Sequence, residues 1–264
     1  MLEIKEVTLS RGSKTLLEDA SILIGTGEKV GLVGVNGAGK TTLLRALRGD
    51  LAPDAGKIVC PARVGYLGQE RLSESLLVGS DASVPVTVRT ALLAGRDLAA
   101  IGAELRAIEA ELEWATAPHA GKDAGATGDV LLARYGALEE RFALAGGYSA
   151  EHEMAELLVG LGLGEVEMER PVAALSGGQK TRLALARLML GGYNTLLLDE
   201  PTNNLDPISR DRVREALAHY RGTLIIVSHD TEFVKALQPD LGLQLPEGKV
   251  RYFDQGQLAL VAKM

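Results

Sequence analysis

Three runs of residues in this chain have the types and the spacing needed to bind and attack a phosphate group. The first follows the apolar stretch Lys29–Val33 and reads Gly34-Val35-Asn36-Gly37-Ala38-Gly39-Lys40-Thr41-Thr42. It matches the phosphate-loop pattern G-x-x-x-x-G-K-[ST], whose glycines let backbone N–H groups curl around nucleotide phosphates. We expect Lys40 to reach the β- and γ-phosphates and the Thr41 hydroxyl to bind Mg²⁺. The nucleotide-binding residues expected here are Gly34, Asn36, Gly37, Ala38, Gly39, Lys40, Thr41 and Thr42.

The second run is apolar and ends in the adjacent carboxylates Asp199 and Glu200. A strand that ends in this way places Asp199 at the carboxyl edge of a sheet, where ligands of α/β proteins bind. We expect Asp199 to be a second anchor for Mg²⁺ and Glu200 to be the base for an attacking water. Taken alone, a strand that ends in two acidic residues is more often structural. The phosphate loop on the same chain favours the catalytic interpretation.

The third run, Leu175-Ser176-Gly177-Gly178-Gln179, precedes a helix predicted over residues 180–190. Glycine amides and a serine hydroxyl at a helix N-terminus form an anion site. The alternative is a capped helix start that holds no ligand. Because the phosphate loop already holds one nucleotide, a second anion site favours a nucleotide presented by another copy of the domain.

The elements that must position these runs follow an alternating order. Apolar stretches Lys29–Val33, 196–198 and 224–227 are each followed by a predicted helix. Strands alternating with helices predict an α/β fold in which a mostly parallel sheet is covered by helices on both faces. The first 25 residues alternate like half-buried strands, which predicts a small antiparallel layer beside that sheet.

Residues 84–147 break this pattern because they carry no strand signal. Two series of apolar residues recur there at steps of three and four, the spacing of a coiled-coil seam. They are Leu98, Ile101, Leu105, Ile108 and Leu112, and, beyond a polar tip over residues 115–129, Leu131, Tyr135, Leu138, Phe142 and Ala145. We expect an antiparallel helical hairpin over residues 84–149, inserted between two parts of a nucleotide-binding domain, 1–83 and 150–264. A plain helical subdomain packed on the body is the alternative.

Composition restricts the classes of function. The 264 residues include 28 basic and 35 acidic ones, a net charge of −7, and 46% are hydrophobic, as in ordinary globular proteins. The acidic balance and an aromatic content of 4% argue against unaided tight binding of nucleic acid. There is no uninterrupted apolar stretch of roughly 18 residues, the length of a membrane helix, and no signal peptide is visible. The single cysteine, Cys60, excludes an internal disulfide, so we expect a cytoplasmic protein.

Together these runs resemble the ATP-binding cassette (ABC) ATPases, which are phosphate-loop NTPases with a helical signature subdomain. The resemblance covers nearly the whole chain and adds a glutamine at Gln69, a dimer-crossing loop that includes Asp206, and a switch histidine at His229. It implies ATP and Mg²⁺ as ligands, with Gln69 a further contact to Mg²⁺. Two cassettes would close face to face, so that Ser176, Gly177, Gly178 and Gln179 complete the ATP site of the partner cassette.

Within that family the chain is similar to the F-type (ABC-F) cassettes, which act on the ribosome and drive no transporter. The stretch from Leu198 to Asp206 is close to the typical Asp-Glu-Pro-Thr-Asn-His-Leu-Asp, with Asn204 in place of the histidine. The interval of 107 residues from Gln69 to Ser176 suits their helical arm. Cassettes usually stack an aromatic ring on adenine where this chain has Arg11, whose guanidinium plane could do the same or could lie in solvent.

The resemblance implies contact with the ribosome, its rRNA and tRNA, in translation regulation or antibiotic protection. F-type proteins carry two cassettes, and this chain has one, so the second cassette is either another part of a longer protein or a second copy. The alternative is the ATP-binding subunit of a membrane transporter, docked on a permease. A DNA-repair or chromosome-organising cassette would need a much longer coiled coil.

Overall fold

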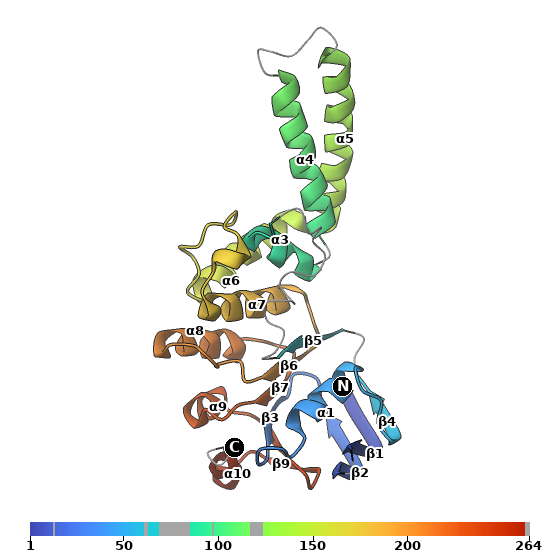
Figure 1. Ribbon diagram of the computed structural model, residues 1–264, viewed down its shortest axis with the longest axis vertical. Coiled ribbons are helices and arrows are strands. Elements are labelled where there is room, and N and C mark those ends of the chain that lie inside the picture. The colour runs from blue at the N-terminus through green and yellow to red at the C-terminus, as the bar shows by residue number, and fades with distance from the viewer. Residues whose placement is uncertain (13, 61–62, 69–84, 97, 117–123, 262–264) are drawn as a thin grey trace.

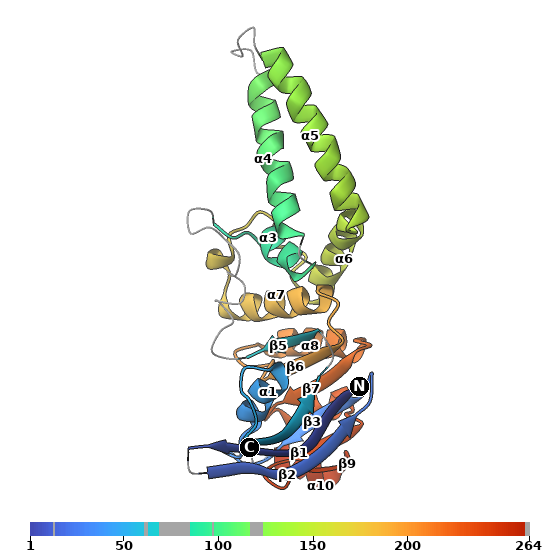
Figure 2. The same cartoon turned by 90° about the vertical axis from the view of Figure 1, so that its right-hand side faces the viewer.

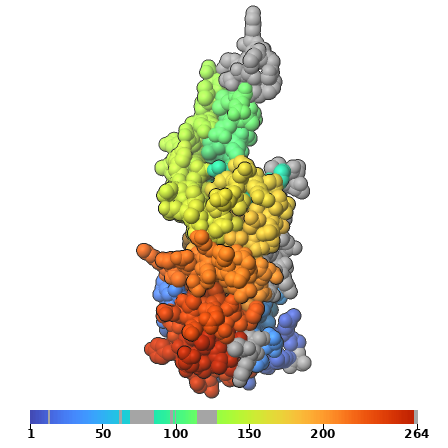
Figure 3. Space-filling view, turned by 90° about the vertical axis from the view of Figure 1, so that its left-hand side faces the viewer, coloured from blue at the N-terminus to red at the C-terminus, as the bar shows by residue number. Residues whose placement is uncertain are grey.

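The computed structural model describes residues 1–12, 14–60, 63–68, 85–96, 98–116 and 124–261. These residues form a body of two sheets and covering helices, from which a long pair of helices projects (Figure 1). The N-terminus and the C-terminal end of the described residues lie on the body, away from the helical pair, in Figures 1 and 2. In the space-filling view the pair stands as a narrow column above the wider body (Figure 3).

The main sheet has the strand order β5-β6-β7-β3-β8-β9. All its neighbouring pairs are parallel except β8 with β9. Its strands are β3 (Lys29–Val33), β5 (Val64–Leu67), β6 (Thr195–Asp199), β7 (Thr223–Val227), β8 (Leu241–Gln244) and β9 (Lys249–Tyr252). The predicted mostly parallel sheet is therefore confirmed. The predicted antiparallel layer is confirmed too, with the order β2-β1-β4. Its strands are β1 (Leu2–Arg11), β2 (Lys14–Ile24) and β4 (Ala55–Val59).

Alternate residues of the central strands point to opposite faces of the main sheet. Leu196 and Leu198 of β6 join one buried cluster, whereas Leu197 between them joins another. This is the period of two that a pleated strand imposes. The Leu197 face packs on α1 (Lys40–Arg48) and the antiparallel layer. The opposite face packs on helices that come from the second half of the chain. Those helices are α6 (Gly147–Gly160), α7 (Gly177–Leu190), α8 (Pro207–Ala218) and α9 (Thr231–Leu237).

The projecting pair consists of α4 (Ala99–Thr116) and α5 (Ala124–Leu144), which lie side by side in both ribbon views. Ile108, Leu131 and Leu138 are buried between them, as the seam spacing predicts. On the body, α3 (Val88–Leu93) and η2 (Ala94–Arg96) precede α4, and η3 (Val172–Ala174) precedes α7. The last helix is α10 (Gln255–Val261). In the described part of the chain, no helix is long and apolar enough to cross a membrane.

Four details of the seam prediction are wrong. Leu98 precedes α4, and both Leu98 and Phe142 pack in the main core instead of between the two helices. Ala145 lies beyond the end of α5 and is exposed, because the chain turns at Gly146, whose φ is 77°. The polar tip is shorter than expected, since α5 already begins at Ala124. The domain boundaries at residues 83/84 and 149/150 stay a prediction.

Candidate functional site

The phosphate loop joins the end of β3 to the start of α1, as the sequence predicts. Three of its glycines, at positions 34, 37 and 39, have positive φ angles of 155°, 77° and 99°. At Gly39 a Cβ atom would lie 2.9 Å from the Cβ of Leu16, closer than real side chains allow. Glycine is therefore required at position 39 both by conformation and by space. The loop therefore packs against Leu16 of β2 at this point.

The side chains at the start of α1 lie within the loop and toward β6. Lys40 is buried, and its Nζ donates hydrogen bonds of 2.7 Å and 3.2 Å to the carbonyls of Gly34 and Val35. Burial lowers the pKa of Lys40, while the carboxylates of Glu200 and Asp199 act in the opposite direction. Its ammonium thus sits close to the loop, with two carboxylates as the nearby opposite charges.

Glu200 follows β6 and pairs with His229, which follows β7. Its Oε2 accepts hydrogen bonds from His229, at 2.8 Å from the ring Nδ1 and 3.3 Å from the backbone N–H. Burial raises the pKa of Glu200, and the charge and hydrogen bonds of His229 oppose that rise. The backbone of Glu200 is left-handed, with φ 55°, and its N–H donates to Val227 at 2.9 Å. A strained backbone held by its neighbours, beside a paired carboxylate, is typical of a functional position.

A pocket of about 400 Å³ brings most of the predicted residues together. Its lining includes Arg11, Asn36, Gly37, Gly39, Lys40, Thr41, Thr42, Asp199, Glu200 and His229. Gly34 and Ala38 belong to the loop but do not line the pocket. Leu16, Asn203 and Val227 also line it, and sequence reasoning missed them. For Asn203 a signal existed, because it stands three residues after Glu200 in a polar run. For Leu16 and Val227, ordinary strand residues, none did.

The third run and the dimer loop lie apart from this pocket. Ser176 caps α7, accepting a hydrogen bond of 3.2 Å from the backbone of Gln179, whose side chain accepts from the backbone of Ser176 at 2.9 Å. Gly177 and Gly178 form the first turn of α7. Asp206 caps α8 in the same manner, with a hydrogen bond of 3.0 Å from the backbone of Ser209. Neither Ser176 to Gln179 nor Asp206 lines the pocket. Gln69, the remaining predicted site residue, lies outside the described residues.

The donor set suits a magnesium ion. The hydroxyl of Thr41 lies 2.9 Å from Oδ2 of Asp199, so a hydroxyl and a carboxylate oxygen meet beside the phosphate loop. Among the described residues, no group of three or more His, Cys, Asp or Glu side chains could hold a metal ion by itself. Mg²⁺ in nucleotide sites is commonly held by one or two protein ligands together with substrate phosphates and water. The residues at this site fit that pattern.

The comparisons with known proteins agree with this geometry. Residues 17–203, which include the phosphate loop, the signature run and the acidic pair, match the profile of a family described as "ABC transporter". The chain belongs to this family. It is an ABC-type ATPase, and the predicted resemblance to ATP-binding cassettes is confirmed.

Relatives of this cassette are themselves ATP-binding proteins. It is 38% identical over 238 residues to the tylosin resistance ATP-binding protein TlrC of Streptomyces fradiae, covering 89% of this chain and 41% of TlrC. It is 31% identical over 239 residues to the uncharacterized ABC transporter ATP-binding protein YfmM of Bacillus subtilis, covering 90% of this chain and 43% of YfmM. The cassette thus spans less than half the length of these relatives.

Among solved structures, the cassette is similar to a chain described as cbiO1 from Clostridium perfringens, part of the ABC transporter complex cbiONQ. The TM-score is 0.61 at 20% identity, covering 99% of this chain and 91% of that chain. At this level of identity the likeness concerns the fold, and it confirms the α/β fold of the ABC ATPase type.

Proposed function

We propose that this cassette binds and hydrolyses ATP with Mg²⁺ and that ATP drives the closure of two such cassettes face to face. The observation that carries the proposal is the pocket in which the phosphate loop, Asp199, Glu200 and His229 meet. The signature residues Ser176 to Gln179 lie outside that pocket, on the capped end of α7. A second cassette would supply its own signature run to this pocket, as the resemblance implies.

The side chains have separate tasks in this proposal. Lys40 and the loop amides bind the phosphates, and Thr41 and Asp199 hold Mg²⁺, which when bound neutralises charge on the phosphate oxygens. Glu200 accepts the proton of the attacking water. His229, already bonded to Glu200, would contact the γ-phosphate, and Gln69 would link the metal to the arm. Arg11 lines the pocket, which supports a contact between its guanidinium and the adenine.

We further propose that the cassette acts on the ribosome, in the cytoplasm, as an ABC-F protein, with the α4–α5 pair as its arm. Two observations support this. The pair projects from the body around its own apolar seam, which is more than an ATPase core requires. The relative TlrC, whose name refers to tylosin resistance, matches 89% of the chain. ATP-driven closure and opening would then move the arm. The proposed division of the chain assigns residues 84–149 to the arm and residues 1–83 and 150–264 to the nucleotide-binding domain.

Replacing residues 99–144 with a short Gly-Ser linker, in the full-length protein, tests this role. We expect ATP binding near the wild-type level, because Lys40, Asp199 and Glu200 lie outside the segment, and loss of ATP-dependent sedimentation with ribosomes. The matched control is Leu132→Ala, which changes an exposed side chain of α5. Residues 84–150 carry a net charge of −3, so binding should fall only gently with salt, at about one unit of slope for each phosphate contact. Contact with RNA would come from a few side chains near the tip of the arm, such as His119 and Lys122, which lie outside the described residues.

A transporter subunit is the second candidate, because the matching family is described as "ABC transporter" and the relative YfmM is named an ABC transporter ATP-binding protein. Its ATP chemistry would be the same, so active-site variants cannot separate the two functions. Undiminished pelleting with ribosomes after loss of the arm would favour the transporter. The coding sequence on either side of this stretch gives an independent test, since a second phosphate loop supports the tandem ABC-F protein and an adjacent permease gene supports the transporter.

A further inference from the structure

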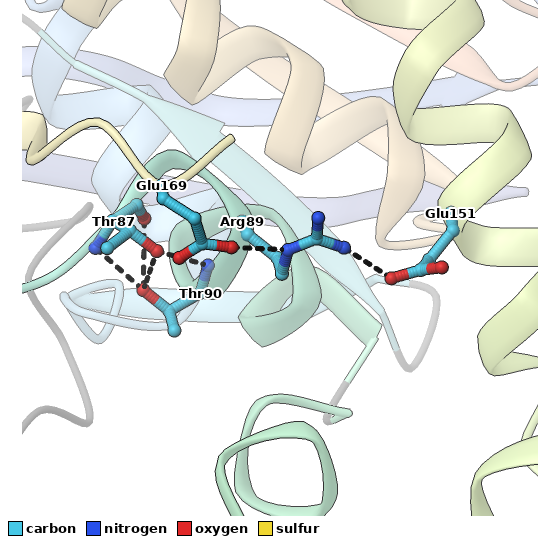
Figure 4. A network of polar contacts seen from close by, with 5 residues as sticks. All are labelled: Thr87, Arg89, Thr90, Glu151 and Glu169. Carbon is cyan, nitrogen blue, oxygen red and sulfur yellow. Dashed lines mark hydrogen bonds and ion pairs between the residues drawn. The ribbon is translucent and has the colours of Figure 1, made fainter. Parts of the chain in front are cut away.

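One arginine at the base of the arm contacts two acidic residues from distant parts of the chain (Figure 4). Arg89 lies in the first turn of α3. Its Nε donates a hydrogen bond of 2.7 Å to Oε1 of Glu169, and its Nη1 donates to Oε1 of Glu151 on α6. The side chain of Arg89 is 27% exposed, compared with 42% for Glu151 and 60% for Glu169. The side chain of Arg89 is thus the most buried of the three, and it has an acidic partner on each side.

The two helices that Arg89 joins are the two roots of the arm. α3 leads through η2 and Leu98 into α4, and the N–H of Leu98 donates to the carbonyl of Leu93 at 3.1 Å. α6 follows α5 directly. The hydroxyl of Tyr148 on α6 donates a hydrogen bond of 2.7 Å to Glu139 on α5. The ring of Tyr148 packs edge-on against Phe142, with 5.7 Å between the ring centroids. A shift of either arm helix therefore pulls on a helix that Arg89 contacts.

The second acidic partner of Arg89, Glu169, belongs to the segment that leads into the signature run. The backbone around Arg89 is already joined to this segment, because the N–H of Arg89 donates to Met168 at 2.9 Å and the N–H of Val88 donates to Arg170 at 3.1 Å. Next along the chain, the N–H of Val172 donates to Val86 at 2.8 Å. The segment then passes through η3 to Ser176, the cap of α7.

The start of α3 is itself held in one conformation. Thr87 and Thr90 form a reciprocal capping box, in which the backbone N–H of Thr87 donates to Oγ1 of Thr90 at 2.8 Å (Figure 4). A capped first turn reduces fraying at the position that carries Arg89. Because that turn is fixed, the guanidinium is presented to both carboxylates at a defined place.

We propose that Arg89 is a positioning residue that links both roots of the arm to the segment carrying the signature, so that the placement of Ser176 depends on the arm. The inference rests on the proposed action of the signature on the ATP of a second cassette. A planar guanidinium donates from two nitrogens to two carboxylates at once, which a lysine ammonium on a flexible stem does less well. Loss of Arg89 also leaves the carboxylates of Glu151 and Glu169 near each other without the positive charge between them.

The test measures closure separately from nucleotide binding. In the full-length protein carrying Glu200→Gln, closed cassettes should retain labelled Mg-ATP through a desalting column. Arg89→Gln should raise the ATP concentration for half-maximal retention about 5-fold, the low end of coupling between sites. Mg-ADP affinity, which reports the phosphate loop alone, should not change. The matched control is Arg214→Gln, because Arg214 pairs with Asp211 within its own helix, at 2.9 Å.

Three further variants separate positioning from simple support of the fold. Glu169→Gln removes the mostly exposed partner next to the signature segment, and it should raise the half-maximal ATP concentration with little change in melting temperature. The triple variant Arg89→Glu with Glu151→Arg and Glu169→Arg restores both ion pairs with their charges reversed and should recover most of the closure. Arg89→Lys should recover less than this charge-reversed set.

Two kinds of result would overturn the role of Arg89, and a third would overturn the proposed closure. A folded Arg89→Gln or Glu169→Gln variant with unchanged half-maximal ATP concentration overturns the proposal, and so does an equal loss of Mg-ADP affinity. If Glu200→Gln alone retains no ATP, the proposed closure is wrong. The role of Arg89 is then tested by the KM for ATP in hydrolysis by the protein that keeps Glu200. An unchanged KM in Arg89→Gln would also overturn the proposal.

Discussion

The hydroxyl of Thr41 donates a hydrogen bond of 2.9 Å to Oδ2 of Asp199, although 158 residues separate them along the chain. Thr41 lies at the start of α1 and Asp199 at the end of β6. The strand order places β7 between β3, which carries the loop, and β6. The contact therefore depends on parallel strands that end at one edge of the sheet. It joins two of the three sequence runs into one site.

This contact predicts how the cassette depends on metal. Thr41→Val keeps the volume of the side chain but removes its oxygen, so we expect the Mg²⁺ concentration for half-maximal hydrolysis to rise about 10-fold. ATP hydrolysis measured over a series of Mg²⁺ concentrations checks this. Hydrolysis should cease when EDTA removes the metal. An unchanged Mg²⁺ requirement would show that Thr41 is not a ligand.

Glu200→Gln tests the proposed role of Glu200 as the base. The amide keeps the shape of the side chain but cannot accept the proton of water, so hydrolysis should slow by about 10²–10⁴-fold while ATP binding remains. Trapped ATP should hold two cassettes together. The mass of the complex in Mg-ATP, measured by light scattering, would then be twice that of one cassette if the second cassette is another copy. A variant that hydrolyses ATP at the wild-type rate would exclude Glu200 as the base.

Two glycines with similar backbone conformations separate the local need for glycine from the crowding at the loop. Gly39 and Gly49 have φ angles of 99° and 91°, but only Gly39 faces a neighbour, Leu16, where a Cβ would be added. Alanine at either position should cost about 1–2 kcal/mol of stability from the left-handed backbone. Only Gly39→Ala should also weaken nucleotide binding. Thermal unfolding and fluorescent-ATP titration of both variants measure the two effects, and equal binding by the two would contradict this reading of the loop.

The arm seam can be tested within one helix. Leu138 is 4% exposed and Leu132 is 59% exposed, both on α5. Leu138→Ala should remove about 2–5 kcal/mol of packing from the hairpin, as buried leucines do elsewhere, whereas Leu132→Ala should have little effect. Hydrogen exchange of the α4 and α5 amides measures the loss. Exchange should not rise in the phosphate loop, and an equal rise there would mean that the arm and body unfold together.

Cys60 should react slowly with thiol reagents. Burial raises the pKa of its thiol to about 11 from a model-compound value of 9.0. The thiol also donates to the carbonyl of Leu47 at 3.0 Å. At pH 8 the thiolate fraction falls about 100-fold below that of an ordinary thiol, and alkylation should slow accordingly. The reaction with iodoacetamide, measured by mass spectrometry on folded and urea-unfolded chains, gives the ratio. Equal rates would contradict the raised pKa of this half-buried thiol.

The raised pKa of Cys60 makes the stability of the fold depend on pH in the alkaline range. Because the folded state favours the protonated thiol, Cys60 stabilises the fold below pH about 9, and that contribution is lost as the pH rises toward 11. Cys60→Ala should therefore flatten the stability profile in this window. Urea denaturation at several alkaline pH values would detect the difference, and parallel profiles for the two proteins would exclude it.

Local chemistry made much of the site visible in the sequence. A loop that curls around phosphates needs glycine and then lysine and threonine at set positions, and these needs appear in consecutive residues from Gly34 to Thr41. Buried parallel strands need unbroken apolar runs, so Leu196 to Leu198 identify β6 and place Asp199 at its end. Seam spacing likewise identified the buried contact of Ile108 with Leu131 and Leu138. In each case a short stretch carries the whole signal.

Tertiary structure decided the contacts between elements that are distant in sequence. Leu16 lines the pocket at the phosphate loop because β2 packs against Gly39, and nothing in its own neighbourhood indicates this. Ala145 continues the seven-residue pattern of α5 but is exposed, because the helix has ended. Arg89 meets Glu151 and Glu169, 62 and 80 residues away, only because α3, α6 and the segment before α7 pack together. Such pairings depend on how whole elements are placed by the burial of their apolar faces, and no local spacing records that placement.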